Sequence, residues 1–177
     1  TLKENISYGD GGGIYMTDSQ HIYAHSTQIL MNVAGTGTPI VDGGGIRITN
    51  LYSNEISQFI NCNIVYNSTL GEPSNGGGIR YDGNANLFYL LNSIVIENQA
   101  TDGPNILGSI NVSYSNVGGG YEGEGNIDAD PLFCDTEGND YTLYTTSPCL
   151  ETGQDGANMG VFGIGCYEDY AGPTWYV

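Results

Sequence analysis

The sequence predicts an all-β chain: a right-handed parallel β-helix (β-solenoid) of three to four coils, followed by an irregular C-terminal β cap. The main observation is a repeat. The string Gly-Gly-Gly-Ile occurs three times, beginning at Gly11, Gly43 and Gly76. Between these strings lie short runs of β-branched and aromatic residues bounded by Gly, Asn, Asp or Ser, and none has the period of a helix. Units of about 30 residues that contain two or three strands and no helix are typical of a solenoid.

The Gly triplet is expected to form a sharp corner at the start of a strand. Gly11, Gly43 and Gly76 lie at this corner because Gly tolerates positive φ and close backbone approach. The residue after each triplet is then expected to point inward and to stack on its equivalents about 4.8 Å away along the axis. These residues are Ile14, Ile46 and Ile79.

An Asn closes the last strand of each unit, at Asn32, Asn67 and Asn98. These residues are expected at one recurring bend, where stacked amides hydrogen-bond along the axis as a ladder. We interpret them as structural residues rather than as a binding site.

The repeats resemble the right-handed parallel β-helix repeat proteins of the bacterial secreted or cell-surface type. The resemblance continues in Asn126–Phe133 (NIDADPLF), Asp140–Leu143 (DYTL) and Ser147–Cys149 (SPC), which are similar to that family's C-terminal cap. It implies β-helix coils in 1–116 and a cap in 117–171. It also implies an extracellular protein, secreted or at the cell surface.

Residues 172–177 resemble a linker and a strand that leads to a next domain or a neighbouring subunit. The segment Thr174, Trp175, Tyr176 and Val177 is the candidate assembly strand, expected to add to an open coil of its neighbour. Thr1 lies within a patterned segment, so we expect a piece of a larger surface protein or a subunit that joins others end to end.

Of the four cysteines, Cys62 aligns with Thr27 and Ser93 in the repeat, which predicts a small buried free thiol. A secreted context favours a disulfide in the cap. Cys134–Cys166 is the first choice and Cys149–Cys166 the next, because the sequence does not fix connectivity.

Charge excludes one class of partner. Three Lys and Arg face 20 Asp and Glu, for a net charge of −17, whereas a nucleic-acid-binding protein needs a basic surface. No apolar run approaches the roughly 20 residues of a bilayer span.

An enzyme is not indicated by any residue set, and no catalytic, cofactor or metal residue is predicted. Arg47 and Arg80 occupy equivalent positions, where they either clamp a sugar acid or balance the charge of Asp42 and Asp82. The acidic cap residues do not match the ligand spacing of an EF-hand. We therefore interpret them as turn residues, with Ca²⁺ binding as the alternative. They are Asp128, Asp130, Asp135, Glu137 and Asp140, with Asn139 between the last two.

The leading hypothesis is therefore a non-catalytic structural or adhesive β-helix module of an extracellular surface protein or filament. We expect it to associate with itself head to tail or with further β-helix domains of the same polypeptide. The alternatives are a carbohydrate-active β-helix enzyme, such as a polysaccharide lyase or glycoside hydrolase acting on acidic glycans, and a glycan-binding module.

Overall fold

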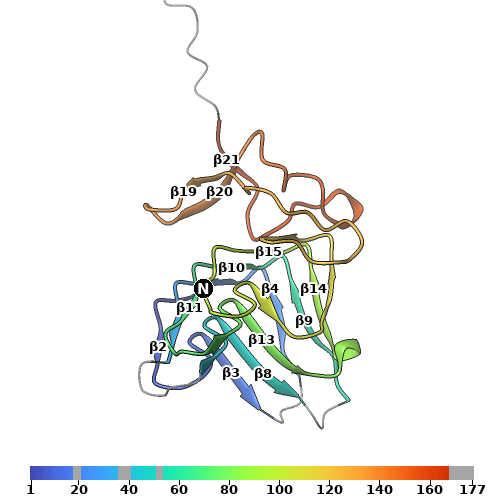
Figure 1. The fold of residues 1–177 in the computed structure, drawn as a ribbon. Coiled ribbons are helices and arrows are strands. Elements are labelled where there is room, and N and C mark those ends of the chain that lie inside the picture. Colours follow the sequence, from blue (N-terminus) through green and yellow to red (C-terminus); the bar gives the residue numbers. More distant parts are fainter. Residues whose placement is uncertain (18–20, 36–40, 51–53, 168–177) are drawn as a thin grey trace, which may run out of the picture.

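The structure is a computed structural model that describes residues 1–17, 21–35, 41–50 and 54–167. Within them the chain is an all-β parallel solenoid of about three coils with a small C-terminal mixed sheet, which confirms the predicted fold class (Figure 1). The described residues contain no α-helix, only the 3-10 turns η1 (Ala85–Leu87) and η2 (Gln154–Gly156).

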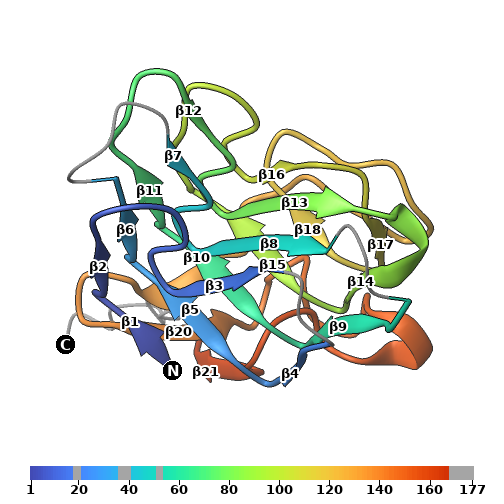
Figure 2. The ribbon, with the colours of Figure 1, turned by 90° about the horizontal axis from the view of Figure 1, so that it is seen from below.

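Five stacks of parallel strands form the coils, and Figure 2 shows several of them side by side. Sheet A contains β1 (Leu2–Lys3), β5 (Gln28–Leu30), β10 (Asn63–Val65), β15 (Ile94–Ile96) and β18 (Asn116–Val117). Sheet C contains β3 (Ile14–Thr17), β8 (Ile46–Asn50), β13 (Ile79–Gly83) and β16 (Ile106–Leu107). Sheet D contains β4 (Tyr23–His25), β9 (Ser57–Ile60), β14 (Phe88–Leu91) and β17 (Asn111–Ser113).

Two shorter stacks complete the coils. Sheet B contains β2 (Ile6–Ser7), β6 (Val33–Ala34) and β11 (Ser68–Thr69), and sheet E pairs β7 (Val41–Asp42) with β12 (Ser74–Asn75). Outside the solenoid, sheet F contains β19 (Phe133–Asp135), β20 (Asp140–Tyr144) and β21 (Ile164–Cys166).

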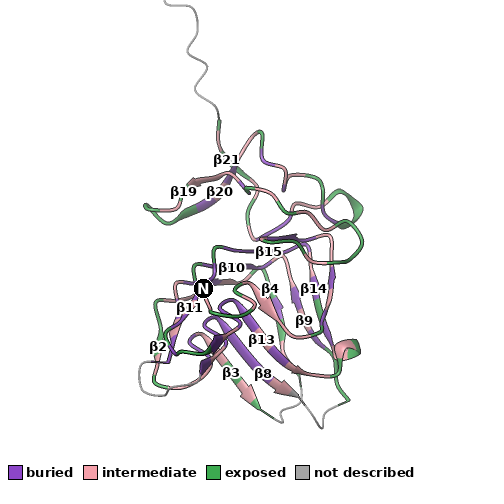
Figure 3. Ribbon diagram, in the orientation of Figure 1, coloured by how far each residue is buried: buried purple, intermediate pink, exposed green. Residues whose placement is uncertain are grey.

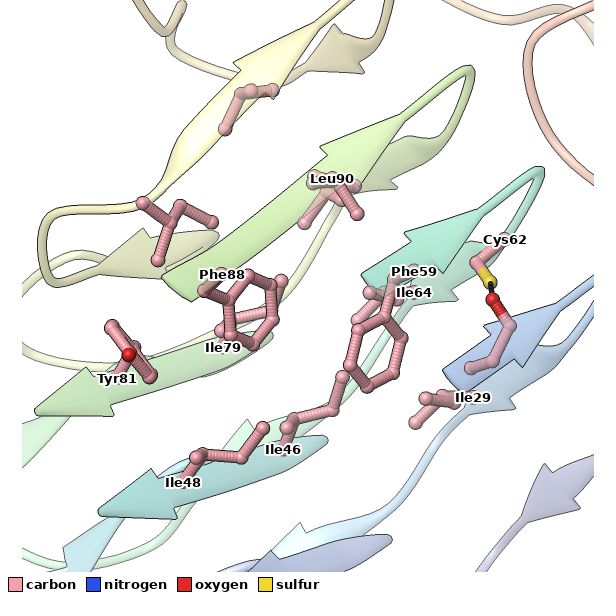
Figure 4. Close-up of a cluster of buried hydrophobic side chains, with 14 of the residues drawn as sticks. Ile29, Ile46, Ile48, Phe59, Cys62, Ile64, Ile79, Tyr81, Phe88 and Leu90 are labelled. Atoms are coloured by element: carbon pink, nitrogen blue, oxygen red, sulfur yellow. Dashed lines mark hydrogen bonds between the residues drawn. The ribbon is translucent and has the colours of Figure 1, made fainter. Parts of the chain in front are cut away.

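The interior of the coils is filled by columns of apolar side chains. Ile46 pairs with Ile14 on one side and with Ile79 on the other, and all three pack in or against the main core. The rings of Phe59 and Phe88 stack at 5.3 Å between centroids (Figure 4). Because equivalent residues of successive coils contact one another, the repeat in sequence becomes a continuous core.

Each Gly of the triplet meets a different steric requirement. In the second repeat Gly43 has a φ of +70°, which L side chains rarely adopt. A Cβ on Gly44 would lie 2.5 Å from the carbonyl oxygens of Gly77 and Ser68. A Cβ on Gly45 would lie 3.0 Å from Cγ of Asn67. The triplet therefore allows the backbones of neighbouring segments to come into contact, and its third Gly packs against the Asn ladder.

The C-terminal end of the coils is closed by the segment 118–127. Ile127 bridges to Asn116 of β18 and its N–H donates to the Ser115 carbonyl. Tyr121 packs against the core, and its hydroxyl donates to the carbonyl of Gly108. This segment continues sheet A by one rung and covers the core at this end.

Residues 131–166, which we call the lateral module, pack on the outward face of sheet A rather than over the end of the coils (Figures 1 and 3). The contact buries Leu30, Val65 and Ile96 of sheet A against a set of module side chains. That set includes Tyr141, Leu143, Cys149 and Met159. The strands of sheet A are thus buried on both faces, and residues 117–166 have two separate packing roles.

Candidate functional site

The Asn ladder runs the length of the coils. The backbone N–H and Nδ2 of Asn32 both donate to Oδ1 of Asn67, at 3.0 and 2.9 Å, and Asn67 donates in the same way to Asn98. Asn5 adds a rung before Asn32, and Asn105 adds one after Asn98. These end rungs lie outside the repeat spacing, so sequence comparison of the units missed them.

A second ladder of short polar side chains lies at the opposite end of the strands of sheet A. The N–H of Cys62 donates to Oγ of Ser93, and the N–H of Ser93 donates to Oγ of Ser115, both at 3.0 Å. Asn126 accepts from the N–H of Ser115 and ends the series. Cys62 is a free, fully buried thiol, and burial raises its pKa to about 11. It fills a structural position rather than a reactive one.

The lateral module is closed by a disulfide between Cys134 of β19 and Cys166 of β21. Of the two expected pairings the structure has the first, and Cys149 is a free buried thiol. Nδ2 of Asn116 donates to the sulfur of Cys149 at 3.2 Å, and burial raises the pKa of this thiol. The assembly segment Thr174–Val177 lies outside the described residues.

Arg47 and Arg80 stack on the outer face of sheet C within a network of carboxylates. Arg47 contacts Asp82 at 2.7 Å and also lies within 3.8 Å of Asp10 and 3.6 Å of Asp42. Arg80 contacts Asp82 at 2.7 Å and Asp42 at 3.9 Å. Both guanidinium groups are therefore engaged by this chain's own carboxylates, which is the charge-balancing arrangement.

The arginines that could bind an acidic glycan, and the aspartates that could form a catalytic pair, bind one another in this network. A lyase-like site requires a free base, and a glycosidase-like site requires two carboxylates facing a substrate. Asp10 and Asp42 instead face Arg47, and Oδ1 of Asp10 accepts from the N–H of Asp42.

The acidic residues of the cap order turns. Oδ1 of Asp135 accepts from the N–H of Gly138, and Asp140 accepts from both the hydroxyl and the N–H of Thr142. The Thr142 hydroxyl and N–H hold the pKa of Asp140 below its usual range. In 1–17, 21–35, 41–50 and 54–167, no three His, Cys, Asp or Glu side chains are grouped so that they could hold a metal ion.

An open cleft of about 810 Å³ lies along the seam between the coils and the lateral module. Three aromatic rings and three carboxylates line it, from Tyr66, Phe133, Tyr144, Glu97, Asp128 and Asp130. None of the chain's three Lys and Arg residues is among the lining residues. No local pattern in the sequence indicates this cleft, because its lining residues are spread from Tyr66 to Tyr144 and come from both the coils and the lateral module.

The first coil presents strand edges. Within the described residues β1, β2, β3 and β4 each lie at the edge of their sheet. Four side chains from this coil that pack against the core are only partly buried, namely Leu2, Ile14, Met16 and Ile22. Edge strands with exposed apolar neighbours are surfaces on which further strands can add.

Comparison with protein-family models, with curated proteins and with solved structures finds no match for this chain. No helix among the described residues is both long and apolar enough to cross a membrane.

Proposed function

We propose that this chain is a non-catalytic structural or adhesive β-helix module of an extracellular surface protein or filament, and that it joins further β-helix units end to end. The observation that carries the proposal is the first coil, in which the strands among the described residues, β1 to β4, are all edge strands with partly buried core residues behind them. A further parallel coil, from the same polypeptide or from a neighbour, would pair these edges and complete the core.

Other features support an extracellular structural role. The Cys134–Cys166 disulfide suits an oxidising compartment. Most of the repeated polar side chains bind other groups of this chain, as they do in the Asn ladder, the second ladder and the Arg network. These features resemble the secreted or cell-surface β-helix proteins, and a cap of that type is part of the proposal.

An edge-blocking variant tests the assembly. The N–H of Ile14 donates to the carbonyl of Gly45, the residue just before β8, so the N–H of Tyr15 points to the open edge of β3. Tyr15→Pro removes this outward donor and Tyr15→Thr keeps it, while both remove the same exposed ring. We expect concentration-dependent end-to-end species in sedimentation velocity and electron microscopy for wild type and Tyr15→Thr only. Equal assembly of Tyr15→Pro would refute the proposal for self-association.

A coil duplication tests the version in which the next unit lies in the same polypeptide. Leu2 pairs with Ile29, which pairs with Ile64, so Thr1 is equivalent to Asn63. A copy of residues 28–62 placed before Thr1 would thus build one more coil in register. We expect slower hydrogen exchange in β3 and β4, and unchanged exchange would count against this version.

A glycan-binding module is the second candidate, and the cleft favours it. Aromatic faces beside hydrogen-bonding groups are typical of sites that bind sugars. The engaged state of Arg47 and Arg80 argues against the acidic glycans that the sequence suggested as substrates.

A further inference from the structure

We propose that the cleft between the coils and the lateral module binds a glycan chain that carries protonated amino sugars. This inference rests on the glycan-binding candidate and is independent of end-to-end assembly, because the cleft and the edges of the first coil are formed by different residues. Charge, aromatic surface and the direction of the cleft each support it.

Charge selects a cationic ligand. Every ionisable side chain that lines the cleft and is charged at neutral pH is a carboxylate, from Glu97, Asp128 and Asp130. No ion pair engages these three carboxylates within the described residues, where Lys3 pairs with Glu4 and both arginines lie in the sheet C network. A concave surface lined by one sign of charge concentrates ligands of the opposite sign.

Two of the carboxylates are held in place by the backbone. Oδ1 of Asp128 accepts from the N–H of Gly119 at 3.1 Å, and Oδ1 of Asp130 accepts from the N–H of Leu132 at 2.8 Å. Neither second oxygen accepts a hydrogen bond from the described residues, so each is available to an ammonium group or a hydroxyl. Carboxylates fixed in this way lose little conformational entropy when a ligand binds.

Aromatic rings select a ligand with flat apolar faces. Tyr66 comes from the coils, whereas Phe133 and Tyr144 come from β19 and β20 of the lateral module. Tyr66 is exposed. The ring of Phe133 is held edge-on against that of Tyr141, with 5.2 Å between centroids. A sugar stacks on such rings through its C–H face, and an ammonium group is attracted to them.

The cleft follows the solenoid axis. Val65 pairs with Ile96, so Tyr66 and Glu97 follow adjacent strands at equivalent positions. Val95 pairs with Val117, which places Gly119 one strand further, where Asp128 binds it. The steps between neighbouring strands are about 4.8 Å, so the lining repeats along the axis at a spacing that suits an extended oligosaccharide.

Matched oligosaccharides provide the test. A fully deacetylated glucosamine hexamer and an N-acetylglucosamine hexamer have the same rings and linkages but differ in charge. Isothermal titration calorimetry of the full chain at low salt should show that the deacetylated hexamer binds at least about tenfold tighter, because hydrogen bonds between charged groups are stronger than neutral ones. Equal or tighter binding of the acetylated hexamer would overturn the charge argument and leave the glycan-binding candidate standing. If neither hexamer bound, both would fail.

Variants locate the site. Asp128→Asn with Asp130→Asn keeps both acceptors for the backbone N–H groups and removes two charges, so we expect at least about tenfold weaker binding. Glu122→Gln with Glu137→Gln removes two exposed charges that do not line the cleft, and it should bind as wild type does. Equal losses in the two double variants would show a general charge effect and overturn the assignment. So would a lysine hexapeptide that bound as tightly as the deacetylated sugar, because it lacks the ring faces.

Discussion

Removing one amide from the middle of the Asn ladder should cost far more stability than removing one from its end. Asn67 is fully buried; its Oδ1 accepts from the N–H and Nδ2 of Asn32, and its Nδ2 donates to the Ile29 carbonyl and to Asn98. Asn67→Ala removes these four hydrogen bonds and a longer one, at 3.3 Å, from Nδ2 to the Val65 carbonyl. Asn5 is exposed, and Asn5→Ala removes only the donation from its Nδ2 to Asn32.

The magnitude follows from which groups lose a partner. In Asn67→Ala the N–H of Asn32 loses its acceptor in the interior, at about 1–3 kcal/mol, and the lost bonds to Ile29 and Asn98 add about 0.5–1.5 kcal/mol each. We therefore expect a loss of about 4 kcal/mol, against about 1 kcal/mol or less for Asn5→Ala. The first value is a large fraction of the stability of an ordinary domain, about 5–15 kcal/mol.

Urea unfolding followed by far-ultraviolet circular dichroism, with the disulfide intact, measures both variants. If Asn67→Ala and Asn5→Ala lowered the free energy of unfolding by amounts within about 1 kcal/mol of each other, the reasoning would be refuted. The hydrogen bonds of the ladder would then not be a main source of stability. Asn67→Asp adds a pH signature, because a carboxylate there would face the Ile29 carbonyl and Oδ1 of Asn98. Burial would raise its pKa in the folded state, so its deficit should be smallest below the unfolded value of about 4 and grow as the pH rises.

Three further outcomes are expected. At pH 8 the native protein should not react with a thiol reagent, whereas the denatured protein should consume two equivalents, one each at Cys62 and Cys149. Because burial raises the pKa of Cys62 to about 11, the free energy of unfolding should fall between about pH 9 and pH 11. This fall should be smaller in Cys62→Ser. Cys134→Ala with Cys166→Ala should lose about 3–4 kcal/mol by the chain-entropy relation for a loop of this length, and the measurement is again the urea midpoint. Arg47→Met should lose about 2–4 kcal/mol, because Asp10 loses its arginine partner and Asp42 and Asp82 keep only Arg80. We expect 1 M salt to reduce this loss of stability, and a loss that did not depend on salt would point to packing instead.

The coils were predictable because their determinants are local and repeated. A Gly that must take positive φ, an Ile that points inward and an Asn that closes the strand recur in each unit, and the structure adds the reason that they occur together. A Cβ on Gly45 would meet the carbonyl oxygen of Gly78 at 2.7 Å and Cγ of Asn67 at 3.0 Å. Position in the repeat also indicated that Arg47 and Arg80 stack, although not how many carboxylates surround each one.

The lateral module and the cleft depend on contacts that no local pattern reveals. Alternation places Ile64 inside and Val65 outside, yet Val65 is fully buried because Tyr141 and its neighbours cover it from about seventy residues further along the chain. One signal was present: β15 consists of three consecutive apolar residues, Ile94–Ile96, and such runs are typical of strands buried on both faces. It indicates that something covers sheet A but not which segment does so.

The placement of the lateral module has a mechanical consequence. A solenoid whose coils contact only their neighbours can unravel one coil at a time from an end. Here one module packs across β5, β10 and β15 together, so a pulling force must detach it before those coils can peel apart. While the disulfide is intact, the segment between Cys134 and Cys166 cannot extend. Its 32-residue separation corresponds to about 110 Å of contour length at full stretch. Under tension the oxidised chain should therefore yield later and lengthen less than the reduced one.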